Sequence, residues 1–321
     1  MQEIVKRRLG KTDIEVTPIG LGAMEFSGGK GMMKFVLSAV PYETQNEVIK
    51  VALDGGMNWI DTAEIYGSGE SEKAVSQGLQ AAGKSPGEVM ITTKWMPIMK
   101  RAKSMHKSAA KSTQRLNPYP IDLYLVHRPE SLSSVETQMD EMAKLVDSGT
   151  IRAVGVSNFS ANRMRKAHEV LGERGIPLAA NQMHFSLVKR NIEFNGVLET
   201  AKELDITIIA YTPLGRGSLT GHLHKNPELL EEMPRFRRSR LRGQLNKTKP
   251  LVDALEGIAL EHEATIAQIV LNWTVNYHGD TIVSIPGATK TYQAEDNANA
   301  MRISLTKEQM ETISTLSHEC L

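Results

Sequence analysis

The sequence predicts a (β/α)8 TIM barrel, an α/β fold, on the basis of three features of the chain. Eight short apolar segments alternate with amphipathic segments that are long enough to form helices. Most of the apolar segments are continuous, without polar residues at every second position, which is typical of parallel strands covered on both faces. The first seven segments end at intervals of 25 to 39 residues, near the roughly 31 residues of one strand–helix unit in an eight-fold barrel of about 250 residues.

The expected strands are short apolar runs with turn residues on both sides. In chain order they cover residues 18–22, 58–61, 89–94, 121–127, 152–157, 179–182, 206–211 and 281–286. The amphipathic segments predict helices over residues 43–54, 72–82, 103–116, 133–148, 162–171, 194–204, 266–276 and 293–301. Several of these helices stop at glycine, as at the Gly55-Gly56 pair and at Gly149, which suits a left-handed C-cap.

The competing fold is a doubly wound parallel sheet, which would place a GxGxxG motif after its first strand. Here Gly20-Leu-Gly22 is followed by Ala-Met-Glu, so the third glycine is missing and the barrel is favoured. Outside the eight units, residues 4–16 predict a short hairpin that covers the bottom of the barrel. Residues 306–318 predict a final helix, because Thr306 and Gln309 have capping-box spacing.

The chain is expected to be one barrel domain over residues 1–321. The seventh and eighth strand ends are 74 residues apart, so an insertion is expected at about residues 212–264. No low-complexity linker divides the chain.

Composition indicates a soluble globular protein, which we expect to be cytoplasmic. The 321 residues are 40% hydrophobic and 23% charged, and 38 Lys and Arg against 37 Asp and Glu give a formal charge of +1. This balance gives no electrostatic reason to expect nucleic acid or an anionic membrane as a partner. The single cysteine, Cys320, excludes an intrachain disulfide and a cysteine-based zinc site. No apolar run approaches a membrane span, and the N-terminus lacks the apolar core of a signal peptide.

Polar side chains gather where the predicted strands end, which is where barrel enzymes carry their chemistry. Asp61, Lys94 and His127 follow three consecutive strands, and Tyr66 lies five residues after Asp61. Taken singly, Asp61 and Lys94 could form a structural ion pair, and His127 could be a hydrogen-bonded interior histidine. Because each buried polar group carries its own desolvation cost, their occurrence on neighbouring strand ends favours a shared site.

The sequence around these positions resembles the aldo-keto reductase family over roughly residues 16–299. The motifs occur in the family's order: DTAEIYG at 61–67, ITTKW at 91–95, LVHRP at 125–129, GTIRAVGVSNF at 149–159, YTPLGRGS at 211–218 and IPGATK at 285–290. The resemblance implies reversible hydride transfer between a reduced nicotinamide and a small-molecule aldehyde or ketone.

The resemblance also implies four catalytic roles that are physically reasonable. Tyr66 would be the general acid, and the ammonium group of Lys94 would lower the pKa of its phenol, which is about 10 when free. Asp61 would keep Lys94 charged and oriented. His127 would donate a hydrogen bond to the oxygen on which negative charge develops.

The other strand ends would then bind the nicotinamide dinucleotide. Tyr211 would stack on the nicotinamide, and Ser157, Asn158 and Gln182 would bind its carboxamide. The ribose is assigned to Ala23 and Met24. The pyrophosphate is assigned to Pro213, Leu214, Gly215, Arg216 and Gly217. The adenosine end is assigned to Pro286, Gly287, Thr289, Lys290, Gln293, Asp296 and Asn297.

The choice between the two dinucleotides depends on the loop after Pro286. Many family members that prefer NADPH carry a basic residue just after this proline and an arginine several residues later, where this chain has Gly287 and Gln293. Thr289 and Lys290 remain available for a 2′-phosphate, so NADPH is expected, with NADH as the alternative.

Several further features give weaker predictions. Met24, Phe26 and Trp95 are expected to line the substrate entrance, and a first loop at residues 27–40 to shape specificity. Five arginines lie between residues 235 and 242, which favours a solvated loop; the alternative is a segment that folds over the cofactor phosphates. His222 and His224 are expected to be an exposed pair, not metal ligands.

Two other functions compete with the reductase. A metal-dependent isomerase or hydrolase could use Asp61, Glu64, His127 and His184, but Lys94 would be an unfavourable cation beside the metal. A reductase-like regulatory subunit could sense nicotinamide redox state for a partner protein. The complete set of Asp61, Tyr66, Lys94 and His127 weighs against a non-catalytic role.

Overall fold

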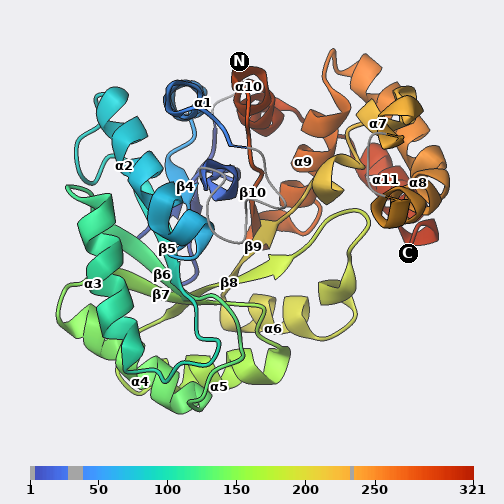
Figure 1. Cartoon of the computed structure of the whole chain (residues 1–321). Helices are drawn as coiled ribbons and strands as arrows, with labels where there is room; N and C mark the ends of the chain where they lie inside the picture. The colour runs from blue at the N-terminus through green and yellow to red at the C-terminus, as the bar shows by residue number, and fades with distance from the viewer. Residues whose placement is uncertain (1–3, 28–38, 232–234) are drawn as a thin grey trace.

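Eight parallel strands form the closed barrel that the sequence predicts, with helices around it (Figure 1). The computed structural model describes residues 4–27, 39–231 and 235–321. The strands are β3 (Leu21–Gly22), β4 (Trp59–Asp61), β5 (Met90–Trp95), β6 (Ile121–Val126), β7 (Ile151–Ser157), β8 (Leu178–His184), β9 (Thr207–Tyr211) and β10 (Ile282–Ile285). The barrel closes where Gly20 N donates to Ser284 O at 2.9 Å and Gly22 N donates to Pro286 O at 3.0 Å. The predicted fold class is therefore confirmed.

Helices cover the outside of the barrel and bury their apolar faces against the strands. They are α1 (Tyr42–Asp54), α2 (Glu70–Ala81), α3 (Ser104–Leu116), α4 (Val135–Asp147), α5 (Ala161–Gly172), α6 (Val197–Leu204), α9 (Ile266–Asn276) and α10 (Thr291–Asn299). Side-chain caps set several starts; Ser134, for example, accepts from Thr137 N before α4. Helix α6 begins three residues later than predicted, because Gly196 directly before it has φ +78°, outside the helical region.

The N-terminal hairpin closes the bottom of the barrel and leaves the opposite end for chemistry. It consists of β1 (Arg7–Arg8) and β2 (Glu15–Val16), paired antiparallel. Leu9 is fully buried at the turn and belongs to the same apolar cluster as Trp59 inside the barrel. Gly10 N donates to Thr207 Oγ1 at 2.9 Å, at the first residue of β9. The predicted plug is therefore confirmed.

The segment between β9 and α9 is largely helical. It contains the 3-10 helices η5 (Gly215–Gly217) and η6 (Pro227–Leu230), and the helices α7 (His222–Lys225) and α8 (Arg235–Glu261). Helix α8 packs on α9 and on the final helix α11 (Lys307–Glu319), which starts at the predicted Thr306 capping box (Figure 1). The prediction that residues 235–242 form a loop is wrong: they begin α8, and the Glu231 carboxylate pairs with Arg238 and with Arg242, the latter at 2.7 Å.

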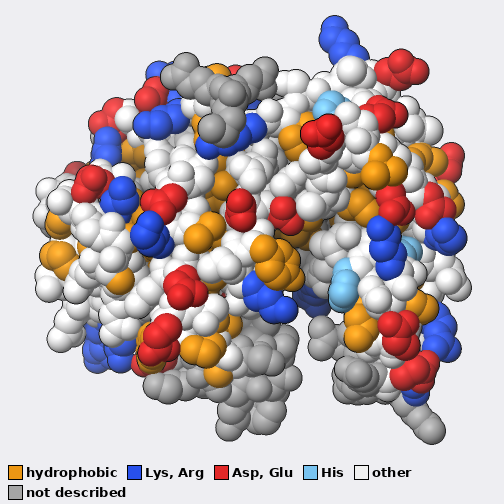
Figure 2. Space-filling view, turned by 90° about the horizontal axis from the view of Figure 1, so that it is seen from above, with side chains coloured by type: hydrophobic (Ala, Val, Ile, Leu, Met, Phe, Trp, Pro, Cys, Tyr) orange, Lys and Arg blue, Asp and Glu red, His pale blue; other side chains and the backbone are white. Residues whose placement is uncertain are grey.

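The charged side chains do not gather by sign on the face of the molecule that Figure 2 shows. Lys and Arg lie interspersed with Asp and Glu on that face, as the balanced composition predicts. Among the described residues, no helix is both long enough and apolar enough to span a membrane.

Candidate active site

A buried ion pair lies at the centre of the candidate site. Asp61 ends β4 and Lys94 lies near the end of β5, and the two strands are neighbours in the sheet. Lys94 Nζ donates to Asp61 Oδ1 at 2.5 Å, and the side chains are 0% and 2% exposed respectively. Lys94 Nζ also donates to Thr62 O at 2.7 Å, and Gln182 Nε2 donates to Asp61 Oδ2 at 2.8 Å from β8. Both buried charges are therefore paired and further hydrogen-bonded, as burial requires.

Burial and the partner charge act in opposite directions on each member of this pair. Burial raises the pKa of Asp61 and lowers that of Lys94, while the partner's charge opposes each shift. Buried Glu72 also favours the charged form of Lys94 and thus raises its pKa. Glu72 itself accepts from Thr93 Oγ1 at 2.6 Å and from Arg115 Nε at 2.5 Å. The carboxylate of Glu72, on helix α2, is therefore a second group that favours the charged form of Lys94.

Tyr66 returns to the barrel mouth because of a tight turn. It begins the 3-10 helix η3 (Tyr66–Gly69), in which Gly67 has φ +61°. A Cβ at Gly67 would overlap the carbonyl of Ser27, so only glycine fits against that loop. This turn places Lys94 Nζ 5.0 Å from the centroid of the Tyr66 ring.

His127 completes the cluster. It directly follows β6, and its backbone N donates to Trp95 O at 2.9 Å. Its ring meets the ring of Tyr66 edge-on, with centroids 5.8 Å apart and an interplanar angle of 84°. Burial, with the nearby charges of Lys94 and Arg128, holds the pKa of His127 well below 6.5, so the imidazole is neutral near pH 7. The structure thus brings together the four side chains predicted to be catalytic.

The protonation of Tyr66 differs from the sequence-based prediction. Burial, followed by the negative charges of Asp61 and Glu25, raises the pKa of Tyr66 well above 10. The expected net lowering of this pKa is wrong for this structure, because burial and the charges of Asp61 and Glu25 outweigh the effect of the Lys94 ammonium group. Tyr66 therefore keeps its proton near pH 7, which suits a proton donor.

The predicted nicotinamide-binding residues form one hydrogen-bonded network at the ends of β7, β8 and β9. Tyr211 OH donates to Asn158 Oδ1 at 2.9 Å, and Asn158 Nδ2 donates to Ser157 Oγ at the same distance. Ser157 Oγ in turn donates to the backbone oxygen of Gln182 at 3.0 Å. The bond from Gln182 Nε2 to Asp61 links this network to the ion pair.

His184 has a place in this region that sequence reasoning missed. Its ring stacks on the ring of Tyr211, with centroids 5.1 Å apart and an interplanar angle of 15°. His184 lies two residues after Gln182 on β8, so strand periodicity puts both side chains on the same side of the sheet. Because His184 covers one face of the Tyr211 ring, a planar ligand can stack only on the other face.

Two loops carry the residues predicted to bind the ribose and the pyrophosphate. Ala23 is buried, and its N donates to Asp61 O at 2.8 Å. In the loop Pro213–Gly217, the consecutive residues Gly215, Arg216 and Gly217 all have positive φ, at 57°, 58° and 89°. The Arg216 side chain is exposed beside this turn. Backbone geometry and an adjacent cation are thus both compatible with an anionic ligand.

The predicted adenosine site lies around the start of α10. Gln293 Oε1 accepts from Thr289 N at 2.8 Å and from Lys290 N at 3.2 Å, so this side chain caps the helix. Asp296 Oδ1 accepts from Gln268 Nε2 at 2.8 Å.

The remaining groups at this end differ in how accessible they are. Asn297 is buried, and its Nδ2 donates to Gly287 O at 3.4 Å. Pro286 is also buried, whereas Lys290 is exposed, with its Nζ 5.7 Å from the ring centroid of Tyr292. Lys290 is therefore the accessible cation among the adenosine-site candidates.

Two of the three residues predicted to line the substrate entrance are buried in the structure. Trp95 is 0% exposed, and its Nε1 donates to Ser104 Oγ of α3 at 3.2 Å; Phe26 is 1% exposed. Successive side chains of a strand point to opposite faces, so Lys94 points into the barrel and Trp95 points outward to the helices. Met24 is half-buried in the 3-10 helix η1 (Met24–Phe26) and remains a candidate. Most of the predicted first loop, residues 28–38, lies outside the described residues.

The residues of the competing metal-site prediction have other contacts. The described part of the chain contains no cluster of three or more His, Cys, Asp or Glu side chains arranged to hold a metal ion. Asp61 is bound to Lys94, and His184 stacks on Tyr211. Glu64 Oε1 accepts from Met96 N at 2.8 Å.

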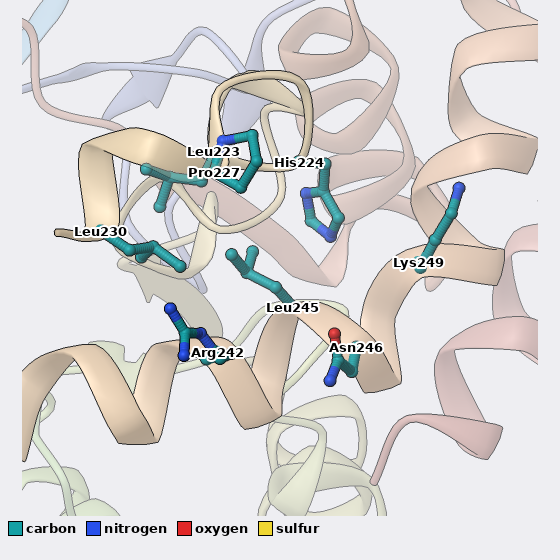
Figure 3. A pocket seen from close by; sticks show the side chains of 8 residues that line it. All are labelled: Leu223, His224, Pro227, Leu230, Arg242, Leu245, Asn246 and Lys249. Carbon is teal, nitrogen blue, oxygen red and sulfur yellow. The ribbon is translucent and has the colours of Figure 1, made fainter.

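A separate hollow of about 300 Å³ lies between α7, η6 and α8 (Figure 3). Its lining includes Leu223, Pro227, Leu230, Arg242, Leu245 and Lys249. His224 also faces it, and its Nε2 lies 3.1 Å from Thr248 Oγ1. This hollow belongs to the segment between β9 and α9, and none of the candidate catalytic residues lines it.

The comparisons with known proteins agree with the fold. The family model described as the aldo/keto reductase family matches residues 18–318. The probable aldo-keto reductase 1 of Glycine max is 30% identical over 95% of this chain and 87% of that protein. Aldo-keto reductase str7 of Strobilurus tenacellus is 32% identical over 98% of this chain and 92% of that protein.

Solved structures of the same family are similar over nearly the whole chain. A thermostable aldo-keto reductase, Tm1743, in complex with the inhibitor epalrestat, has a TM-score of 0.77 and 27% identity, covering 98% of this chain and 100% of that one. An aldo-keto reductase from Klebsiella pneumoniae in complex with NADPH has a TM-score of 0.75 and 25% identity, covering 98% of this chain and 95% of that one. The barrel, the convergent side chains and these similarities show that the chain belongs to the aldo/keto reductase family.

Proposed function

We propose that this protein reduces the carbonyl group of a small aldehyde or ketone, reversibly, with Tyr66 as the general acid. The observation that carries the proposal is the convergence of Tyr66, the Asp61–Lys94 pair and His127 at one end of the barrel. Membership of the aldo/keto reductase family supports a nicotinamide cofactor. When bound, a reduced nicotinamide would supply the hydride.

The side chains of this site divide the remaining work. As negative charge develops on the carbonyl oxygen, the protonated phenol of Tyr66 donates its proton to that oxygen. Lys94 then stabilises the resulting phenolate, and Asp61 keeps the ammonium group in place through the 2.5 Å contact. The neutral imidazole of His127 donates a hydrogen bond through a ring N–H and orients the carbonyl.

The binding groups at the other strand ends fit a dinucleotide. The free face of Tyr211 provides a surface for a planar ring, and the network of Ser157, Asn158 and Gln182 provides amide and hydroxyl groups beside it. We assign the pyrophosphate to the Gly215–Gly217 turn and the 2′-phosphate of NADPH to exposed Lys290 near the N-terminus of α10. The NADPH complex of the Klebsiella pneumoniae relative supports this choice over NADH.

A panel of carbonyl compounds, followed at the absorbance band of the reduced nicotinamide with NADPH and with NADH, tests the proposal. We expect oxidation of the cofactor that depends on the carbonyl compound, with a higher kcat/KM for NADPH. Tight cofactor binding without turnover of any compound would instead favour a subunit that senses redox state.

A further inference from the structure

A carboxyl group without a role in the proposed mechanism lies beside the candidate cofactor site. Glu25 is in η1, directly after β3 at the chemical end of the barrel. The loop that carries it is tied to the site twice. Ala23 N donates to Asp61 O at 2.8 Å, and the Ser27 carbonyl packs against the backbone of Gly67 in the Tyr66 turn.

The carboxyl group of Glu25 occupies space at the seam where β3 meets β10. A Cβ at Gly287 would overlap both carboxyl oxygens of Glu25, so the missing side chain at position 287 leaves the room that the carboxyl group fills. Glu25 Oε2 is buried and has no hydrogen-bond partner among the described residues. A buried oxygen without a partner at this position can form a hydrogen bond with a ligand that binds beside it.

The surroundings of Glu25 disfavour a negative charge. Burial raises its pKa to about 7, offset only by a hydrogen bond from its own backbone. No described Lys, Arg or His contributes a shift in the opposite direction. Tyr66 is a titratable neighbour of Glu25 within the described part of the chain; its pKa is well above 10, so it stays protonated and neutral. Near pH 7 the carboxyl group is thus divided between its two protonation states.

We propose that Glu25 faces the bound nicotinamide dinucleotide across Gly287 and takes up a proton when the dinucleotide binds. This inference rests on the proposed function, because it requires that the dinucleotide occupy the loop after β10. The dinucleotide is an anion, and a charged carboxylate in this poorly solvated seam would be repelled by it. A protonated carboxyl group is neutral and can donate its proton to a phosphate or ribose oxygen of the ligand.

The sign of the resulting pH dependence follows from linkage. Below the pKa of Glu25 in the free protein the carboxyl group already carries its proton, so the dissociation constant is flat. Above that pKa each binding event must take up a proton, and the dissociation constant rises by up to about tenfold per pH unit. Affinity therefore falls as the pH rises above neutrality.

Calorimetric titration with NADH, in two buffers that differ in ionisation enthalpy, measures the protons taken up on binding. NADH is the better probe because the 2′-phosphate of NADPH itself titrates with a pKa of about 6. At pH 7.5 we expect the unsubstituted protein to take up roughly three quarters of a proton. Glu25→Gln should abolish this uptake, and at pH 8.5 it should bind NADH about thirtyfold more tightly than the unsubstituted protein.

Two further variants complete the experiment. Glu308→Gln removes an exposed carboxylate on α11 and should leave the proton uptake unchanged. Gly287→Ala pushes the Glu25 carboxyl group aside, so it should weaken NADH binding and reduce the uptake even where Glu25→Gln does not fold. Binding without proton uptake, or an uptake that neither Glu25→Gln nor Gly287→Ala alters, would overturn the inference. Failure to bind either dinucleotide would instead overturn the proposed function.

Discussion

Replacing Lys94 by methionine tests whether the Asp61–Lys94 pair holds the candidate site together. The substitution keeps the length and apolar stem of the side chain but leaves the Asp61 carboxylate buried without its counter-charge. The two side chains are 2% and 0% exposed, and removing one partner of such a buried pair costs about 3–5 kcal/mol. This is a large part of the 5–15 kcal/mol that is typical of the free energy of unfolding of a domain.

The double substitution Asp61→Asn with Lys94→Met separates the charge imbalance from the loss of packing. Without either charge, nothing ionic remains buried at this position, so we expect the free energy of unfolding to recover to within about 2 kcal/mol of the unsubstituted protein. Lys166→Met is the control, because Lys166 forms an exposed ion pair with Glu169 at 3.2 Å. It should change the free energy of unfolding by less than about 1 kcal/mol.

Urea unfolding followed by tryptophan fluorescence gives these free energies, and the pH gives a second check. Without Lys94, the pKa of Asp61 in the folded protein rises further above its unfolded value. A group with a raised folded pKa contributes stability at low pH that is lost as the pH rises through the folded pKa. The destabilisation by Lys94→Met should therefore be larger at pH 8 than at pH 5. A loss below about 1 kcal/mol at pH 8, or a double variant no more stable than Lys94→Met, would refute the reasoning.

Three other predictions concern catalysis and cofactor binding. Tyr66→Phe should lower kcat by about 10²–10⁴ while leaving the dissociation constant for NADPH nearly unchanged; full turnover by this variant would remove Tyr66 from the mechanism. Lys290→Met should reduce the ratio of NADPH to NADH affinity by roughly fivefold, since one charge-assisted contact to the 2′-phosphate is lost; an unchanged ratio in binding titrations would move the phosphate elsewhere. If the start of α8 folds over the cofactor, NADPH should slow proteolysis between residues 235 and 242, and equal cleavage with and without NADPH would count against that contact.

The barrel could be predicted because its physical requirements leave a regular trace in the sequence. Strands covered on both faces need continuous apolar runs, and each strand–helix unit consumes a similar length of chain. The predicted strand ends at 61, 94 and 157 therefore agree with the observed ones to within one residue. The candidate site followed from the same logic, since the carboxyl ends of parallel strands meet at one end of the barrel.

The errors arose where neighbouring atoms decide the outcome. Strand alternation, which the prediction for Trp95 overlooked, turns that side chain outward into the core beside α3. The pKa of Tyr66 depends on burial and on Asp61, and a list of nearby residue types does not show which effect dominates. At residues 235–242 the arginines dominate the sequence pattern and favour a solvated loop, whereas these residues begin a helix.

Two contributions to the site have no local signal in the sequence. The stack of His184 on Tyr211 requires the ring orientations of two different strands. The position of Glu25 against Gly287 joins residues from opposite ends of the chain, and only the closure of β3 onto β10 brings them together. A search for strand-end residues on opposite sides of the closing seam could have found the second of these.

The close approach of Gly67 to Ser27 limits what a substitution at position 67 can show. Because there is no space between the two backbones, the Tyr66 turn and the Glu25 loop must shift as one unit. A methyl group introduced at position 67 would therefore displace Tyr66, the proposed proton donor, and the carboxyl group of Glu25 in the same step. In such a variant, a loss of turnover and a loss of dinucleotide affinity would both come from the same displacement. A substitution at position 67 therefore cannot show which of the two side chains is responsible for which loss.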